Sequence, residues 1–155
     1  MAGKKKFDAR GMMETAIRIM ADSISEHRAD GKASPLVGAV LVKQDGSVES
    51  ASRGELRDGD HAEFALLERK NRSSKLDGAV LFSTLEPCAP GSRRHPKLSC
   101  AERIVLARIK EVWASEDGRG CPGDALRGGS VVMIRFGAAF LGHESGRIPG
   151  CYGPI

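Results

Sequence analysis

The feature that most constrains this chain is a set of three metal-type donors in its central third. His61 is followed two positions later by Glu63, and Cys88 and Cys100 are separated by residues 89–99. One imidazole and two thiolates form a good ligand set for zinc and leave the fourth tetrahedral position for water. A nearby carboxylate that is not a ligand then completes a hydrolytic centre. The sequence therefore predicts one Zn²⁺ held by His61, Cys88 and Cys100, with Glu63 as general acid and base.

Length and composition set broad limits. The 155 residues fit one domain of common size, and 41% hydrophobic residues suffice for a core. No stretch approaches the ~20 apolar residues that a membrane span needs. The basic start, Lys4 to Lys6, is not followed by the apolar run of a signal peptide. We expect a single cytoplasmic domain over 1–155 with no membrane contact, whose cysteines bind metal or stay free rather than form disulfides.

Charge and aromatic content bear on the partner. A formal charge of +4 is too mild to require a nucleic acid, and 5% aromatic residues offer few platforms on which single-stranded bases could stack. A small-molecule partner is favoured. The sequence leaves open whether the chain forms a homo-oligomer.

The chain alternates between helix and strand patterns. Met13, Ile17, Met20 and Ile24 share one face of an amphipathic helix expected over 8–28. The alternation indicates an α/β fold, with helices packed on a mixed sheet. The Gly-rich part from 118 to 155 shows little pattern, and the roles of its Cys121 and Cys151 stay open. Strands are expected at 36–43, 47–52, 79–84, 111–115 and 131–136, and further helices at 61–71 and 99–109.

Two of these helices begin at a ligand. Asp60 is expected to cap the helix that opens with His61, with Glu63 at its third position. Ser99 is expected to cap the helix that opens with Cys100, again with a glutamate at the third position. Each pattern is that of a capping box. The helix dipole would then favour negative charge close to the metal.

The segment between the two cysteines is basic. It contains Arg93, Arg94 and His95. These residues form either a solvated loop or a lip of the substrate site that meets phosphate. His95 is also a candidate fourth ligand, which would make the metal site closed and structural.

At this point the chain resembles the cytidine-deaminase-like superfamily, nearest to the pyrimidine deaminase domain of riboflavin-biosynthesis proteins. The matching motifs are Pro35-Leu36-Val37-Gly38-Ala39-Val40 before the histidine, and Thr84-Leu85-Glu86-Pro87-Cys88. Those domains also carry a long insertion between the two cysteines. The resemblance covers about residues 10–116.

The resemblance implies a three-layer fold with a central mixed five-stranded sheet and helices on both faces. It also implies that the backbone of Gly38 and Ala39 lines the base pocket. Two positions depart from the pattern. Ser34 stands where an asparagine usually contacts substrate, and Gly54-Glu55 stands where a histidine is usual. A carboxy-terminal reductase domain is not expected.

The activity expected is that of a zinc-dependent hydrolase acting on cyclic amidine C–N bonds. It would convert an amino-substituted pyrimidine, or a related nucleobase, nucleoside or nucleotide, to the oxo form and release ammonia. Ser34, Gly38, Ala39, Arg93, Arg94 and His95 are the candidate substrate contacts. Two alternatives remain at this stage: a nucleic-acid-editing deaminase, and a non-catalytic interaction module stabilised by zinc.

Overall fold

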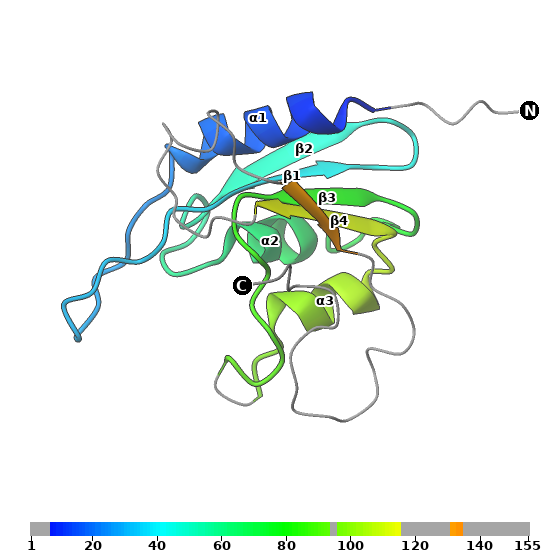
Figure 1. The fold of residues 1–155 in the computed structure, drawn as a ribbon. Helices are drawn as coiled ribbons and strands as arrows, with labels where there is room; N and C mark the ends of the chain where they lie inside the picture. Colours follow the sequence, from blue (N-terminus) through cyan, green and yellow to red (C-terminus); the bar gives the residue numbers. More distant parts are fainter. Residues whose placement is uncertain (1–6, 94–95, 116–130, 135–155) are drawn as a thin grey trace, which may run out of the picture.

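The computed structural model describes residues 7–93, 96–115 and 131–134, and is built around one mixed sheet (Figure 1). Its strands lie in the order β2-β1-β3-β4-β5. β1 is antiparallel to β2 and to β3, β3 is parallel to β4, and β4 is antiparallel to β5. The prediction of a mixed α/β fold is confirmed. The strand bounds are Gly38–Val42 for β1, Val48–Ser52 for β2, Val80–Ser83 for β3, Glu111–Ser115 for β4 and Val131–Ile134 for β5.

One face of the sheet is covered by helix α1, Ala9–Met20, which lies across it in Figure 1. Its apolar stripe packs on side chains of β1 and β3 that alternate toward this face. Helix and sheet approach closely at Gly38, where any side chain would collide with the backbone of Ala16 and Met20. The buried cluster here is Met13, Ala16, Ile17, Met20, Val40, Val42, Val80 and Phe82.

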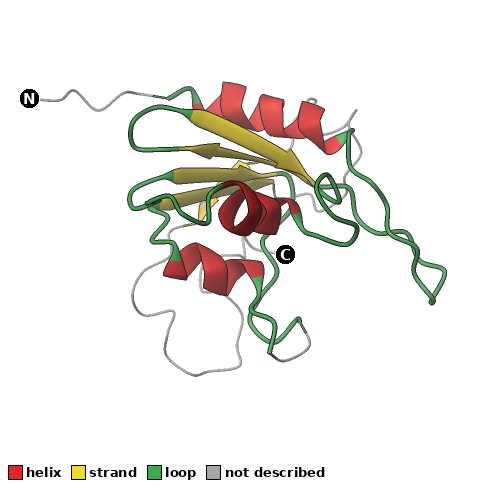
Figure 2. Cartoon of the chain, turned by 180° about the vertical axis from the view of Figure 1, so that it is seen from behind, coloured by secondary structure: helices red, strands yellow, loops and turns green. Residues whose placement is uncertain are grey.

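The opposite face carries the other helical segments, as the view from behind shows (Figure 2). They are α2, Ala62–Phe64, which continues as the π-helix η1, Ala65–Lys70, and then α3, Cys100–Leu106. Ala39 and Leu41 of β1 point to this side and join a second buried cluster. Helices therefore lie on both faces of the sheet.

Several predicted elements differ in extent. The first helix ends at Met20 rather than at residue 28, and Ile24 is 54% exposed instead of packed. Beyond Met20 the backbone joins the sheet edge, because the Ile24 amide donates to the Arg53 carbonyl at 2.9 Å. The helix predicted over 99–109 ends at Leu106, and Arg108 takes a positive φ of 55°. Positions 135 and 136 of the last predicted strand lie outside the described residues.

The capping prediction is confirmed for one helix and wrong for the other. Ser99 accepts from the Glu102 amide, and the Glu102 carboxylate accepts from Ser99 in return. At the other helix the N-cap is His61 itself, without a side-chain cap. The Asp60 carboxylate instead accepts a hydrogen bond from Arg69 Nε at 3.0 Å, and Glu63 turns into the core.

The start of β1 and the ends of β2 and β3 lie together at one edge of the sheet, from which the chain leads to the site. The register pairs Gly38 with Ser52 and Ala39 with Ser83, so β1 begins where β2 and β3 end. The segment from β3 to Cys88 and the loop from β2 to His61 both leave from this edge. In the described part of the chain no helix is long and apolar enough to cross a membrane. Cytoplasmic location and the oligomeric state remain predictions.

Candidate active site

The three donors predicted from sequence come together beside this edge. The ligand-type atoms of His61, Cys88 and Cys100 all lie within 4.8 Å of one another. His61 Nδ1 is 3.4 Å from Cys100 Sγ. Donors around a tetrahedral zinc would be about 3.5–3.8 Å apart, given Zn–N and Zn–S bonds of about 2.0 and 2.3 Å. The donor set therefore fits zinc after small shifts of the side chains.

Local structure fixes each donor. His61 is the extended residue directly before α2, and its carbonyl accepts from the Ala65 amide at 2.9 Å. Cys100 opens α3 and is 3% exposed. Cys88 is tied to α3 twice, since its Sγ accepts from the Cys100 amide at 3.1 Å and its carbonyl accepts from the Ala101 amide at 3.2 Å. The two cysteines are thus neighbours in space despite the loop between them.

The pKa values of the two thiols are shifted in opposite directions. A hydrogen bond from Cys100, followed by one from His61, lowers the pKa of Cys88 to about 3. The same hydrogen bond with Cys88, together with burial, raises the pKa of Cys100. Cys88 is therefore the thiolate of the pair. Metal binding would also release the proton of Cys100, since thiolates are the ligands.

Glu63 lies beside this cluster and is 3% exposed. Its Oε1 accepts a hydrogen bond from Ser83 Oγ at 3.1 Å, and its Oε2 is 3.8 Å from Cys100 Sγ. Burial raises the pKa of Glu63, although the Ser83 hydrogen bond acts in the opposite direction. A carboxyl group that is close to the donors, buried and raised in pKa has the properties of a general acid and base.

The basic loop reaches the site through Arg93. Its Nη1 lies 2.7 Å from His61 Nε2. A guanidinium cannot accept a hydrogen bond, so Nε2 is the acceptor and the ring hydrogen is on Nδ1. A metal at Nδ1 would move that hydrogen to Nε2, because a neutral imidazole carries only one. Arg93 would then have to leave His61 and would be free to contact another group.

The remaining predicted substrate contacts are dispersed. Ser34 is buried and donates to Glu26 Oε1 at 3.2 Å. Gly38 faces α1, and its amide donates to Thr84 Oγ1 at 3.1 Å. Ala39 is fully buried on the same face as its register partner Ser83. Arg94 and His95 lie outside the described residues, as do Cys121 and Cys151.

Sequence reasoning missed two features of this region. Ser83, which holds Glu63, carried no signal beyond its place at the end of a strand. The buried Arg53 forms an ion pair at 2.7 Å with the partly exposed Glu26 near the same edge. The sequence signal for this ion pair was the position of Arg53, a charged residue directly after the β2 strand.

Comparison with known proteins identifies the class. The model of the family described as the cytidine and deoxycytidylate deaminase zinc-binding region matches residues 11–116. The chain belongs to this family. The zinc-binding region that the family model describes, together with the His-Cys-Cys cluster of this chain, confirms zinc as the cofactor.

Particular relatives come from riboflavin biosynthesis. The chain is 34% identical over 111 residues to the riboflavin biosynthesis protein RibD of Mycobacterium tuberculosis, covering 71% of this chain and 31% of that protein. It is 29% identical over 126 residues to RibD of Corynebacterium ammoniagenes, covering 81% and 35%. Thus it spans about a third of the length of these relatives.

A solved structure shares the fold. It is a diaminohydroxyphosphoribosylaminopyrimidine deaminase/5-amino-6-(5-phosphoribosylamino)uracil reductase from Thermotoga maritima. The match has a TM-score of 0.51 and 28% identity, and covers 66% of this chain and 27% of that one. The expected similarity to the pyrimidine deaminase domain of riboflavin-biosynthesis proteins is confirmed.

Proposed function

We propose that this protein is a zinc-dependent hydrolytic deaminase. It would replace the amino group of a pyrimidine, or of a related nucleobase, nucleoside or nucleotide, by an oxo group and release ammonia. The observation that carries this proposal is Glu63. It is a buried carboxyl group held by Ser83 Oγ, with Oε2 3.8 Å from Cys100 Sγ in the donor cluster. Structural zinc sites have no need for such a group.

The roles follow from position. His61, Cys88 and Cys100 would hold the zinc, which when bound supplies a Lewis acid that activates water. Glu63 accepts a proton from that water as the oxygen bonds to the ring carbon bearing the amino group. It passes one proton to the ring nitrogen and moves a second to the departing amino nitrogen. The C–N bond breaks, ammonia leaves, and the oxygen stays on the ring as the oxo group.

The substrate class is supported by the relatives and by the loop. The matched relatives carry riboflavin-biosynthesis names, and the Thermotoga protein is named for a phosphoribosylaminopyrimidine. Arg93 reaches the donor cluster from the loop between the cysteines. A phosphorylated pyrimidine would place its anionic end against this loop, where Arg94 and His95 are further candidate contacts. The backbone of Gly38 and Ala39, where β1 begins, would contribute to the walls of the base pocket.

The test is ammonia release by the zinc-loaded protein, against amino-pyrimidines, amino-purines, and their nucleosides and nucleotides. Glu63→Gln is the matched variant, because the amide keeps the shape and removes the proton carrier. We expect it to retain about one zinc per chain and to lose at least ~100-fold in kcat, as for a general acid and base.

Two other outcomes would replace the proposal. Turnover confined to cytosine or adenine in single-stranded nucleic acid would identify an editing deaminase. Zinc that is retained with no turnover on any compound, and lost on changing His95, Cys121 or Cys151, would identify a closed structural site in an interaction module. Equal activity in wild type and Glu63→Gln would contradict the role of Glu63.

A further inference from the structure

Arg53 is a buried arginine that the proposed reaction does not use. It follows β2 directly and is 6% exposed. Its amide donates to the Val37 carbonyl at 2.8 Å, which extends the β1–β2 pairing by one residue. Side chains alternate along a strand, so Arg53 points to the same face as Ala51, which packs in the cluster beneath α2. That face also carries Ser83 and Glu63.

The chain from Arg53 to His61 forms a closed loop. The amide of Gly54 donates to the carbonyl of Asp60 at 3.0 Å, so the residues that flank this pair are close in space. With 3.8 Å between consecutive Cα atoms, the Cα atoms of Arg53 and His61 are at most about 13 Å apart. Arg53 therefore lies at the same edge of the sheet as the donor cluster and on the same face.

A hydrogen bond to Glu26 holds the Arg53 guanidinium in place but uses only part of its N–H donors. Arg53 Nη2 donates to Glu26 Oε1 at 2.7 Å, and Ser34 Oγ donates to the same oxygen at 3.2 Å. Arg53 Nε is buried, and none of the described residues accepts a hydrogen bond from it. An arginine has five N–H donors, and buried donors in proteins are nearly always satisfied. The unmatched donor is therefore available to a ligand group.

Charge narrows the kind of partner. Burial raises the pKa of Glu26, but its hydrogen bond and charge interaction with Arg53, helped by Ser34, more than offset this and lower the pKa. Glu26 is therefore ionised at neutral pH, and it compensates the positive charge of Arg53. A compensated guanidinium suits a neutral acceptor, such as a carbonyl or hydroxyl oxygen, better than a phosphate.

We propose that Arg53 is a specificity-determining residue of the candidate active site, which donates hydrogen bonds to a neutral oxygen of the substrate. That oxygen is a ring carbonyl or a sugar hydroxyl. Glu26 is the positioning residue that fixes the guanidinium, and Ser34 acts through Glu26 rather than on the substrate. The inference rests on the proposed function and deepens it.

The direct test follows the Arg53 Nε–H signal by ¹H–¹⁵N NMR in the zinc-loaded, full-length Glu63→Gln protein, which cannot turn over its ligand. The Arg53→Lys variant assigns the signal by its loss. The probes are cytidine, 2′-deoxycytidine, the cytidine analogue lacking the ring oxo group, and cytidine 5′-monophosphate. We expect cytidine to shift this signal and slow its exchange with water. The probe that fails to do so identifies the missing oxygen as the one recognised.

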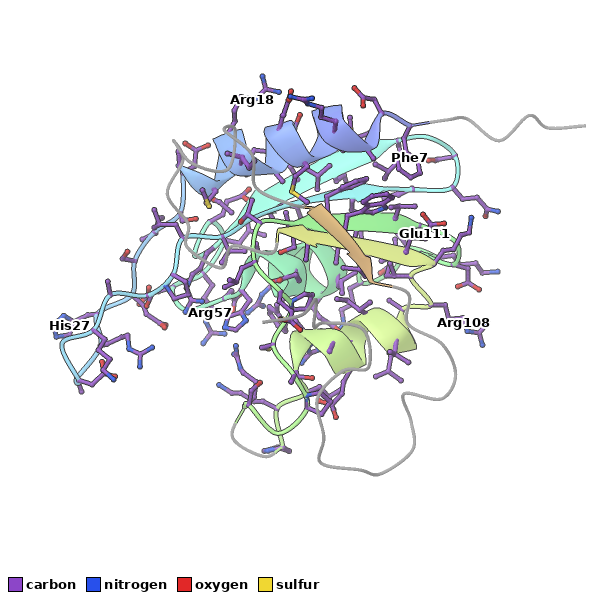
Figure 3. All side chains as sticks on the ribbon, in the orientation of Figure 1. Phe7, Arg18, His27, Arg57, Arg108 and Glu111 are labelled. Atoms are coloured by element: carbon purple, nitrogen blue, oxygen red, sulfur yellow. The ribbon has the colours of Figure 1, made fainter. Side chains whose placement is uncertain are left out.

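Variants supply the second measurement, by calorimetric binding of the same probes. Arg53→Lys keeps the charge and loses the planar fork, so we expect at least ~10-fold weaker binding of cytidine, with zinc content unchanged. Binding of the analogue without the recognised oxygen should not change. Glu26→Gln should show a smaller loss of the same selectivity. Arg57→Lys is the matched control, because Arg57 is an exposed arginine in the same loop, where Figure 3 labels it.

The outcomes separate the two proposals. If no probe moves the Arg53 signal, or if Arg53→Lys weakens all probes equally along with the melting temperature, Arg53 is structural and the inference is overturned. Ammonia release that persists in that case leaves the proposed function standing. A selective Arg53 response without ammonia release would support the inference and sink the deaminase.

Discussion

The two faces of the sheet bury different kinds of side chain. On the α1 face the apolar cluster runs from Met13 and Met20 to Val40 and Phe82, and a buried polar residue beside it, Ser52, is uncharged. On the α2 and α3 face the apolar cluster is accompanied by buried polar groups, including Arg53, Glu63 and Ser83. Burying such groups costs free energy unless they are hydrogen-bonded or bind a ligand. Both faces bury apolar side chains that stabilise the fold, but the charged groups suited to chemistry lie on the α2 and α3 face.

The largest expected effect would come from breaking the chemical face at its metal. Cys100→Ala removes one of three donors, so zinc should be lost and ammonia release abolished. Because metal binding is coupled to folding, the free energy of unfolding should fall by several kcal/mol. Metal analysis and urea unfolding measure both. A chelator should reproduce the effect in the wild type and leave the variant unchanged. Full zinc retention in both Cys100→Ala and Cys88→Ala would contradict the site.

The next effect would come from breaking the apolar face. A Cβ on Gly38 would lie closer to backbone atoms of Ala16 and Met20 than real Cβ atoms approach. Gly38→Ala should therefore cost about 3 kcal/mol, the upper end for overpacking. Gly31→Ala is the control: its φ of 69° strains an alanine backbone, which does not apply at Gly38, but its Cβ would meet open space. That control should cost about 1 kcal/mol. Thermal unfolding tests the difference, and a cost at Gly38 no larger than that at Gly31 would contradict the close packing of α1 on β1.

A smaller effect is expected on the α2 and α3 face, where two substitutions can separate recognition of the phosphate from recognition of the base. Arg93 lies at the donor cluster and Arg94 follows it. If the substrate is a nucleotide, changing both to alanine should lower kcat/KM for it roughly 10- to 100-fold, since charge-assisted hydrogen bonds contribute about 1.5–3 kcal/mol. The nucleoside should be nearly unaffected. Equal loss on the two substrates would indicate general damage, and no loss on either would leave the loop as a solvated lid.

The smallest effect tests the ion pair at the edge between the faces. The pKa of Glu26 is lowered in the folded protein, so its contribution is present above its ordinary pKa of 4.5 and is lost as pH falls through the lowered value. Glu26→Gln should cost no more than about 1 kcal/mol near neutral pH, because the pair is partly exposed. That cost should shrink below about pH 4.5. Urea unfolding between about pH 7 and pH 3 checks this, and a constant difference would rule out the charge as the cause.

The sequence predicts the donor cluster because chemistry limits the choices. Few arrangements explain His61, Cys88 and Cys100 together with a nearby Glu63, and the α3 capping box follows from local spacing. The strands are also readable, since buried strands form short apolar runs. These features depend on residue type and on separations of a few positions.

Other features depend on contacts between distant segments, which local patterns do not encode. Asp60 has the local form of a cap, but Arg69 competes for its carboxylate. The segment 61–71 reads as one helix, yet it becomes a π-helix after Phe64, where Asn71 Nδ2 donates to the Leu66 carbonyl at 3.0 Å. Glu26 lies between α1 and β1 and Arg53 directly follows β2, so their ion pair joins segments that are distant in the sequence. Only the folded chain brings such partners together.

The double attachment of Cys88 to α3 has a consequence for how such a protein changes over time. The Cys100 and Ala101 amides close the loop at its base, so residues 89–99 form a side branch of the site. The positions of the two cysteine donors therefore do not depend on the length of this branch. Going from the two residues of the usual deaminase spacing to eleven raises the closure entropy by only about 1.5 kcal/mol. This branch is therefore a place where new recognition segments can be inserted, exchanged or grafted at small cost, while the hydrolytic centre beneath is left as it was.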